Sequence, residues 1–212
     1  MKHFAKTVLL VLLVCVMPAS LAAQSDTFIS LFDGTFDGWT IENSEAGSFT
    51  IVDGNLHVEG GSGWLRSDNQ YSNFVIRSEF RWLSPDADSG IYVRAVADSE
   101  FIRGWPNHSY QVQVRDPAGE SRFPPVGGLF RHGMPEGESE LDIDAVDKAY
   151  AAYGGTGEWH QIRIEVQGDL LTVWLNGTEI GHAHDIADQA GYVGIQSELG
   201  TIEYRSIEIQ ER

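Results

Sequence analysis

Apolar and polar residues alternate along most of the chain, with the period of two that is typical of strands buried on one face. The clearest example is the segment 74–83, where Phe80 and Trp82 fall on one face and charged residues on the other. The same alternation predicts further strands at residues 90–96, 110–115, 158–166, 170–175, 178–184, 192–197 and 201–210.

Two pairs of turn residues separate neighbouring apolar runs. Asp53-Gly54 lies between the runs 49–52 and 55–58, and Asn176-Gly177 follows another predicted strand. Both pairs favour the positive φ angles of a tight hairpin. Each pair therefore predicts two antiparallel strands joined by a two-residue turn.

Helical periodicity is scarce, and its best candidate is the short Ala-rich segment 144–153. About ten or more short strands without crossover helices predict an all-β protein, namely an antiparallel β-sandwich. No linker or repeat divides the chain, so we expect a single domain over 27–211. Only 100–157 is irregular and rich in Gly and Pro, and we expect these loops to wall a cleft.

The N-terminal segment 1–22 has the pattern of a secretory signal peptide. Lys2 and Lys6 precede the apolar run 7–17, and small residues follow Pro18 at the spacing of a cleavage site. The apolar run is too short to remain as a stable membrane span. We therefore expect the protein to be secreted or periplasmic.

Composition narrows the function classes. The chain has 31 acidic and 14 basic residues, a formal net charge of −17, which disfavours binding to nucleic acid phosphates. Cys15 is the only cysteine, so the chain can form no internal disulfide and no Cys-based zinc site.

Several local motifs have two interpretations. His182 and His184 share a strand face and could bind a metal, although a surface strand is the favoured interpretation. The run 86–90 is weakly similar to a calcium loop but is better explained as a turn. On a strand, Glu140, Asp142 and Asp144 would share one face, and their spacing resembles the signature of retaining β-glucanases. A solvated acidic run is the alternative.

A second set of motifs is spread along the chain and resembles the 3-keto-disaccharide hydrolase domain family over 28–210. The motifs are Phe32-Asp33-Gly34, Asp37-Gly38-Trp39, Ser89 to Arg94, Tyr110 to Asp116, Trp174 to Gly177, Gly194 to Glu198 and Ile202 to Ile207. The resemblance implies a concanavalin A-like β-jelly-roll, export, and activity on glycosides with a ketone at carbon 3. Gln111 stands where many relatives carry Glu, and a glutamine cannot serve as a proton-transfer base.

The chemistry of such a substrate can be stated from first principles. The ketone acidifies the hydrogen on carbon 2, so a base can remove it and the aglycone can leave carbon 1 by elimination, after which water adds. The site then needs a base, an acid for the leaving oxygen, and a cation or metal for the enolate oxygen. A divalent metal ion is left open, and no other cofactor is implied. A partner oxidoreductase would make the ketone.

Strand periodicity groups the candidate residues by face. Arg94 is the candidate for stabilising negative charge, Glu198 for base or metal ligand, and His132 for acid or base. The alternative for Arg94 is a structural ion pair with Glu198 or Glu203. The alternative for His132 is an ordinary loop histidine without a catalytic role. The candidates for substrate binding are Tyr92, Gln111, Gln113, Gln196 and Trp105. Trp105 is either a sugar-stacking platform or a loop anchor.

Two other function classes remain in view. A non-catalytic carbohydrate-binding module is the main alternative, because β-sandwiches of this kind serve both functions. A retaining β-glucanase that uses Glu140 and Asp144 is the third.

Overall fold

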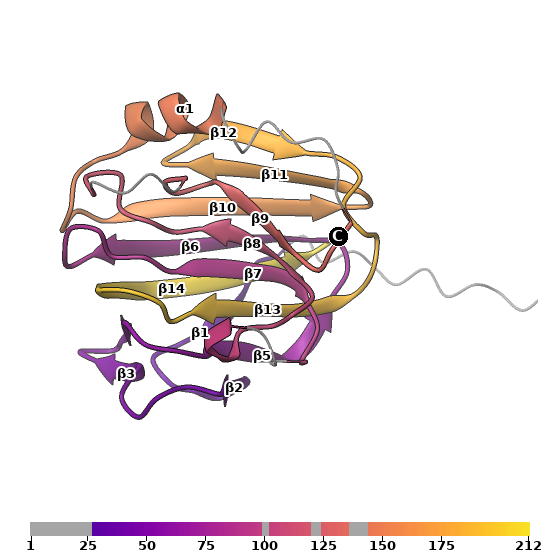
Figure 1. Cartoon of the computed structure of the whole chain (residues 1–212). Helices are drawn as coiled ribbons and strands as arrows, with labels where there is room; N and C mark the ends of the chain where they lie inside the picture. The colour runs from indigo at the N-terminus through magenta and orange to yellow at the C-terminus, as the bar shows by residue number, and fades with distance from the viewer. Residues whose placement is uncertain (1–26, 99–101, 120–123, 136–143) are drawn as a thin grey trace, which may run out of the picture.

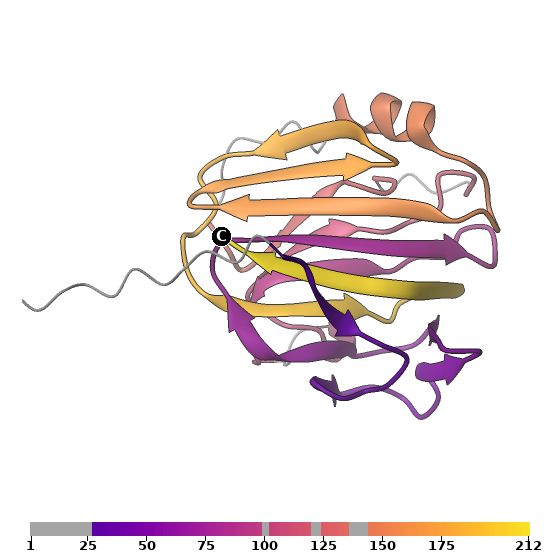
Figure 2. The same ribbon diagram turned by 180° about the vertical axis from the view of Figure 1, so that it is seen from behind.

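The computed structural model describes residues 27–98, 102–119, 124–135 and 144–212. In these residues two antiparallel sheets stack face to face, which confirms the predicted β-sandwich (Figures 1 and 2). The predicted signal peptide lies outside the described residues. None of the helices in the described segments is long and apolar enough to span a bilayer.

The larger sheet, sheet A, faces the viewer in Figure 2 and has eight strands. Its strand order is β12-β11-β10-β6-β14-β4-β3, and β1 also pairs with β14. Its strands are β1 (Ile29–Phe32), β3 (Phe49–Val52), β4 (Asn55–Glu59), β6 (Phe74–Trp82), β10 (His160–Gln167), β11 (Leu170–Leu175), β12 (Thr178–Ala183) and β14 (Thr201–Glu211).

The smaller sheet, sheet B, lies in front in Figure 1 and has the strand order β2-β5-β13-β7-β8-β9. Its strands are β2 (Trp39–Glu42), β5 (Trp64–Tyr71), β7 (Gly90–Ala95), β8 (Ser109–Gln113), β9 (Leu129–His132) and β13 (Gly191–Gln196). A short 3-10 helix, η1 (Ile102–Gly104), follows β7. The helix α1 (Asp144–Ala152) lies beside β12 (Figure 1) and confirms the helical candidate.

Both predicted hairpins form. Asp53 and Gly54 have φ angles of 51° and 81°, and Asn176 and Gly177 have 49° and 81°. Positive φ at both central residues is the property for which these turn pairs are favoured. The turns join β3 to β4 and β11 to β12, so they set the register at both edges of sheet A.

Four strands were not predicted by the alternation: β1, β2, β5 and β9. In β5 the residues 68–70 are polar and exposed, and the pairing with β13 shifts register at this point. β9 has only four residues and lies between glycines. Such strands form because a neighbouring strand exchanges backbone hydrogen bonds with them. The apolar–polar alternation of a single segment does not reveal that neighbour.

The core lies between the two sheets. Phe80 and Trp82 of β6 pack edge to face, with ring centroids 4.8 Å apart, against the inward face of sheet B. The indole Nε1 of Trp82 donates a hydrogen bond of 3.1 Å to the carbonyl of Val114. This bond ties the segment after β8 to sheet A, and that segment carries one side of the site described next.

Candidate active site

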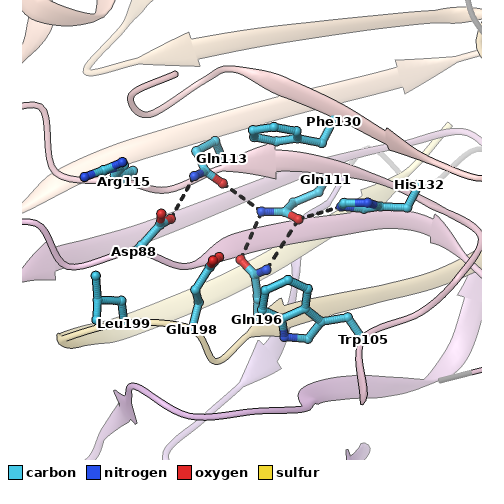
Figure 3. Close-up of a pocket in the computed structure, with 10 residues that line it drawn as sticks. All are labelled: Asp88, Trp105, Gln111, Gln113, Arg115, Phe130, His132, Gln196, Glu198 and Leu199. Atoms are coloured by element: carbon cyan, nitrogen blue, oxygen red, sulfur yellow. Dashed lines mark hydrogen bonds between the residues drawn. The ribbon is translucent and has the colours of Figure 1, made fainter. Parts of the chain in front are cut away.

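A pocket of about 260 Å³ opens on the outer face of sheet B (Figure 3). Its walls come from β8, β9 and the end of β13, from the segments just before β7, after β8 and after β13, and from the loop after η1. The lining residues are Asp88, Trp105, Gln111, Gln113, Arg115, Phe130, His132, Gln196, Glu198 and Leu199. Six of the eight residues predicted for the site are among them: Trp105, Gln111, Gln113, His132, Gln196 and Glu198.

Strand alternation on β8 explains how the pocket is formed. Tyr110 and Val112 point into the core, so Gln111 and Gln113 point outward. Gly90 of the neighbouring strand β7 provides the space for this arrangement. A Cβ atom at Gly90 would lie 2.6 Å from both Cγ and Nε2 of Gln111, so the Gln111 side chain crosses β7 where a side chain is absent.

Three glutamine amides form a connected network on the floor of the pocket. Nε2 of Gln111 donates to Oε1 of Gln113 at 2.7 Å and to Oε1 of Gln196 at 2.9 Å. Each of the three glutamines is at most 3% exposed. Buried amides that satisfy one another in this way form a rigid wall, because each would lose a hydrogen bond on turning.

Asp88 has the most perturbed carboxyl of the pocket. Its pKa is raised to about 8, first because of burial and then because of the nearby Glu198 charge, while Arg115 opposes the shift. Nε2 of Gln113 donates to its Oδ1 at 2.8 Å. Asp88 therefore keeps its proton at neutral pH and can act as an acid.

Glu198 faces the same pocket. Burial raises its pKa, and the positive charges of Arg103 and Arg115 act in the opposite direction. The guanidinium of Arg115 is 5% exposed and donates to Oδ1 of Asp86 at 2.9 Å. Asp88 and Glu198 thus share one pocket, and paired carboxyls in different surroundings can divide the roles of acid and base.

His132 lines the pocket as expected, at the end of β9. Its Nε2 lies 2.9 Å from Oε1 of Gln111, and its ring stacks nearly parallel to Phe130, with 7° between the planes. Burial lowers the His132 pKa, so the ring is neutral at neutral pH. A neutral ring that donates to Gln111 has its proton on Nε2.

Trp105 closes one end of the pocket. Its indole Nε1 donates to the carbonyl of Ser197 at 3.1 Å, and the ring packs with Trp64 and Tyr92 in a small apolar cluster on the outer face of sheet B. Tyr92 was expected to bind substrate. It is instead fully buried within this cluster and is not a lining residue.

Arg94 does not reach the pocket, so its predicted place in the site is wrong. Val93 and Arg94 together oppose one residue of β13, and Arg94 has a φ of 51°, which is the pattern of a β-bulge. The bulge ends the alternation that places Tyr92 and Arg94 on one face. The alternative ion pairs with Glu198 or Glu203 are also not formed.

The Arg94 guanidinium instead binds backbone. Nη1 donates to the carbonyls of Gly168 and Ala187, Nη2 donates to that of Ser72 at 3.0 Å, and Asp188 lies 3.4 Å away. The side chain is 0% exposed. Arg94 therefore connects three loops, those that contain Ser72, Gly168 and Ala187, and its role is structural.

A buried pair of hydroxyls supports the pocket from below. Oγ of Ser89 donates to the carbonyl of Gln196 at 2.7 Å and lies 3.0 Å from the hydroxyl of Tyr204 on β14. This contact links the two sheets directly under Asp88 and Gln196. The positions of the pocket residues are therefore set by the core.

The candidate metal ligands stay apart. In the described residues, no three His, Cys, Asp or Glu side chains are grouped to hold a metal ion. His182 of β12 and His184, which follows the strand, have ring centroids 5.0 Å apart, and neither lines the pocket. A divalent metal in the site therefore stays a prediction.

Of the acidic run proposed for a β-glucanase site, only Asp144 lies in the described residues. Glu140 and Asp142 lie outside the described residues, and Asp144 is the first residue of α1 instead of part of a strand. A carboxylate row on one strand face, as expected for a glucanase, is therefore not continued to Asp144.

A family model matches residues 27–210, and its description is a 3-keto-alpha-glucoside-1,2-lyase-like domain. The chain belongs to this family. Among curated proteins, none matches the chain in sequence. The family membership confirms the resemblance on which the site prediction was based.

Solved structures show how widely this fold is shared. A protein assigned to the glycosyl hydrolases from Parabacteroides distasonis superposes with a TM-score of 0.66 at 16% identity, covering 87% of this chain and 94% of the other. Carbohydrate binding module CBM66 from Bacillus subtilis gives 0.58 at 15%, covering 82% and 96%. A Bacillus licheniformis β-glucanase gives 0.56 at 10%, covering 88% and 98%. These likenesses show the jelly-roll fold, and the family model adds the 3-keto-alpha-glucoside-1,2-lyase-like domain.

Asp88, Arg115, Phe130 and Leu199 are pocket residues that the site prediction missed. Arg115 shares the strand parity of Gln111 and Gln113, which was a usable signal. Asp88 has the same parity as Gly90 and Tyr92, but it was interpreted as part of a turn. The sequence pattern did not mark Phe130 or Leu199. Each reaches the pocket because its segment pairs with another strand or bridge residue, Phe130 opposite Gln111 and Leu199 opposite Asp88.

Proposed function

We propose that this protein cleaves glycosides whose sugar ring carries a ketone at carbon 3, by elimination followed by hydration. The observation that carries the proposal is the juxtaposition of a protonated Asp88 with Glu198 in one pocket of a chain from this family. Elimination needs one base and one acid near adjacent carbons, and this pair provides both.

The roles follow from the charges in the pocket. The Glu198 carboxylate removes the proton from carbon 2, and the electrons of that bond form an enolate with the carbon 3 oxygen. The buried Arg115 guanidinium stabilises the developing negative charge. When the carbonyl re-forms, the bond from carbon 1 to the glycosidic oxygen breaks, and Asp88 protonates the departing oxygen.

Hydration completes the reaction in the same pocket. Asp88 leaves the elimination step as a carboxylate, so it can take a proton from the water that adds to carbon 1. Glu198, now protonated, returns a proton to carbon 2. The two carboxyls then have their starting protonation states, and the products are a free 3-keto sugar and the released aglycone.

The test compares a 3-keto-glucoside with its parent glucoside. We expect release of the aglycone only from the ketone, and exchange of the carbon 2 hydrogen in deuterated water. Glu198→Gln should abolish the exchange, whereas Asp88→Asn should retain exchange and lose release. Each substitution should lower turnover by about 10²-fold or more, as loss of a general acid or base does. Release of the aglycone from both substrates would contradict the proposal. So would the absence of hydrogen exchange in both the wild type and Asp88→Asn.

A non-catalytic carbohydrate-binding protein is the second candidate, supported by the shared fold with a carbohydrate binding module. Binding of the 3-keto-glucoside without turnover would favour it. Export through the segment 1–22 and supply of the ketone by an oxidoreductase are further parts of the proposal. The length of the secreted chain and the requirement for prior oxidation of the sugar test these parts.

A further inference from the structure

A chain of hydrogen bonds runs in one direction across the pocket floor (Figure 3). Nε2 of His132 donates to Oε1 of Gln111 at 2.9 Å, and Nε2 of Gln111 donates to Oε1 of Gln113 at 2.7 Å. Nε2 of Gln113 then donates to Oδ1 of Asp88 at 2.8 Å. The chain connects a histidine on β9 to the proposed acid ahead of β7.

The direction of the chain is fixed as a unit. A glutamine amide accepts only at oxygen and donates only at nitrogen, so turning one amide puts like groups in contact with both neighbours. Gln196 strengthens this constraint because its Oε1 accepts the second N–H of Gln111 at 2.9 Å. All three amides are buried, and leaving a buried amide without a partner is unfavourable.

We propose that His132 is a positioning residue that determines which oxygen of Asp88 carries the proton, acting through Gln111 and Gln113. With the His132 proton on Nε2, the chain ends as an N–H group at Oδ1 of Asp88. Oδ1 is then an acceptor, and the carboxyl proton resides on Oδ2. The consequence for turnover rests on the proposed function, whereas the coupling itself does not.

Without a donor at position 132, the opposite orientation becomes accessible. Gln113 can then present Oε1 to Asp88, and the carboxyl must place its proton on Oδ1 to meet it. That proton is bound to the floor of the pocket and is unavailable to a leaving oxygen. Reversal of Gln111 also turns Gln196, which exchanges hydrogen bonds with it. The common orientation of these three amides therefore distinguishes a competent acid from an incompetent one.

The surroundings hold the His132 ring in the required orientation. Phe130 stacks on one side with centroids 6.2 Å apart, and Tyr92 meets the ring edge-on at 6.3 Å. Burial keeps the ring neutral by lowering its pKa. Asp88 is otherwise faced by the charges of Glu198, Arg115 and Arg103, by the Ser89 amide and by the Tyr204 hydroxyl.

The experiment measures the Asp88 pKa directly, by carboxyl ¹³C NMR of the full-length protein labelled at aspartate. His132→Leu removes the donor, so the stabilisation of ionised Asp88 by Gln113 is lost and the Asp88 pKa should rise by about half a unit or more. His132→Gln places an amide N–H at the position of Nε2 and should restore the wild-type titration. His108→Leu alters an exposed histidine that pairs with Asp98 and is the matched control.

A second variant cuts the chain elsewhere. Gln111→Met fills the same space without polar atoms and should raise the Asp88 pKa as His132→Leu does, which decides the question if the His132 variant does not fold. On a 3-keto-glucoside, both variants should lower kcat by about tenfold or more with little change in KM. His132→Gln should recover most of this loss.

Two results would overturn the inference. One is an unchanged Asp88 titration in both His132→Leu and Gln111→Met. The other is an equal shift in His132→Gln, because ring packing alone would then explain the effect. If the wild-type protein does not act on the 3-keto-glucoside, the proposed function fails, and the NMR titration still decides the coupling.

Discussion

Asp88 illustrates how surroundings can convert a common side chain into an acid. Its carboxyl is 8% exposed, shares a pocket with Glu198 and receives one side-chain hydrogen bond from Gln113. Loss of hydration disfavours the charged form more than this bond and the Arg115 charge favour it. Groups arranged for chemistry in this way commonly reduce the stability of the fold.

This cost predicts a pH dependence of stability. In the folded protein Asp88 keeps its proton up to about pH 8, whereas in the unfolded chain the pKa is near 3.8. The folded state thus binds the extra proton between these values, and the free energy of unfolding should fall as the pH rises across the window. Asp88→Asn retains the acceptor for Gln113 without a charge. It should be more stable than wild type at pH 8, by on the order of 1.4 kcal/mol for each pKa unit.

Urea denaturation from pH 5 to pH 9 measures this difference. Asp68→Asn is a matched control, since Asp68 is exposed and pairs only with the Thr40 hydroxyl in the described residues. Parallel pH profiles for wild type and Asp88→Asn would contradict the prediction.

Single residues of the site could be predicted where strand parity was enough. Gln111 and Gln113 alternate with core residues, so their common outward face was visible in the sequence. The role of Asp88 was not, because its burial arises from Leu199 and Glu198, which are more than a hundred positions away. A pKa depends on such neighbours, and parity carries no information about them.

At the scale of elements, the bulge in β7 separates two functions on one strand. Before it, Gly90 makes room for the pocket amides, whereas Arg94, within the bulge, turns away to bind loop carbonyls. Gly191 of β13 packs against the bulge, since a Cβ atom there would lie 2.4 Å from the Arg94 carbonyl carbon. Tight hairpins can be predicted from their turn residues. A bulge adds one residue to a strand, and no residue type in this strand indicated where it would occur.

This separation predicts that substituting Arg94 and substituting Arg115 will have different effects on stability and on kcat. Arg94→Lys keeps a charge but cannot reach three carbonyls, so buried acceptors lose their donors at about 1–3 kcal/mol each. We expect a lower melting temperature and an unchanged kcat for the folded protein. Arg115→Lys should show the reverse, with kcat reduced and stability less affected.

Thermal unfolding and turnover measured on the same samples test this pair. A loss of kcat in Arg94→Lys at a temperature where the protein is fully folded would return Arg94 to the catalytic site.

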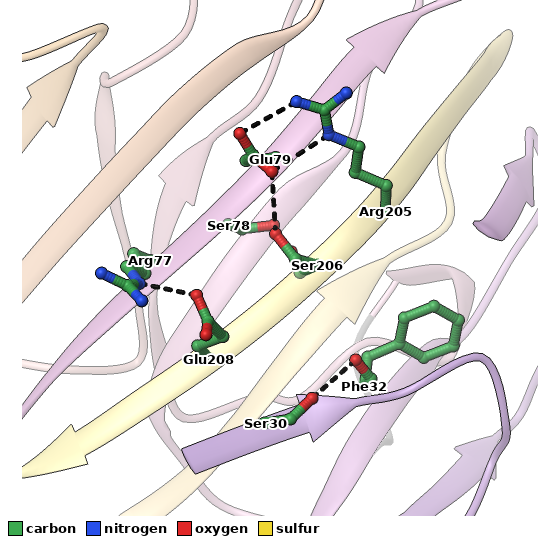
Figure 4. A network of polar contacts seen from close by, with 8 residues as sticks. All are labelled: Ser30, Phe32, Arg77, Ser78, Glu79, Arg205, Ser206 and Glu208. Carbon is green, nitrogen blue, oxygen red and sulfur yellow. Dashed lines mark hydrogen bonds and ion pairs between the residues drawn. The ribbon is translucent and has the colours of Figure 1, made fainter. Parts of the chain in front are cut away.

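At the scale of the whole molecule, the two sheets have different outer faces. Sheet B carries the pocket, and sheet A carries several cross-strand ion pairs (Figure 4). Arg77 pairs with Glu208 at 2.6 Å, and Arg205 binds Glu79 through two bonds of 3.0 Å. Exposed pairs of this kind contribute about 0–1 kcal/mol each, so they organise the surface more than they stabilise it.

Net charge has the larger effect on stability at this scale. The chain has 31 acidic and 14 basic residues, so a formal charge of −17 remains even if every basic residue is paired with an acidic one. Salt screens their repulsion, because the Debye length falls from about 10 Å at 0.1 M to about 3 Å at 1 M. We therefore expect the melting temperature to rise between 0.1 and about 1 M NaCl. A fall would mean that the ion pairs of sheet A outweigh the repulsion.

Trp105 bounds the pocket on one side. It packs there with Trp64 and Tyr92, which fill the outer face of sheet B beside the pocket. An internal unit of a polysaccharide has neighbours on both sides and would need two exits. Small glycosides and the terminal unit of an oligomer need only one, so under the proposed function we expect the protein to act on these in preference to polymer interiors.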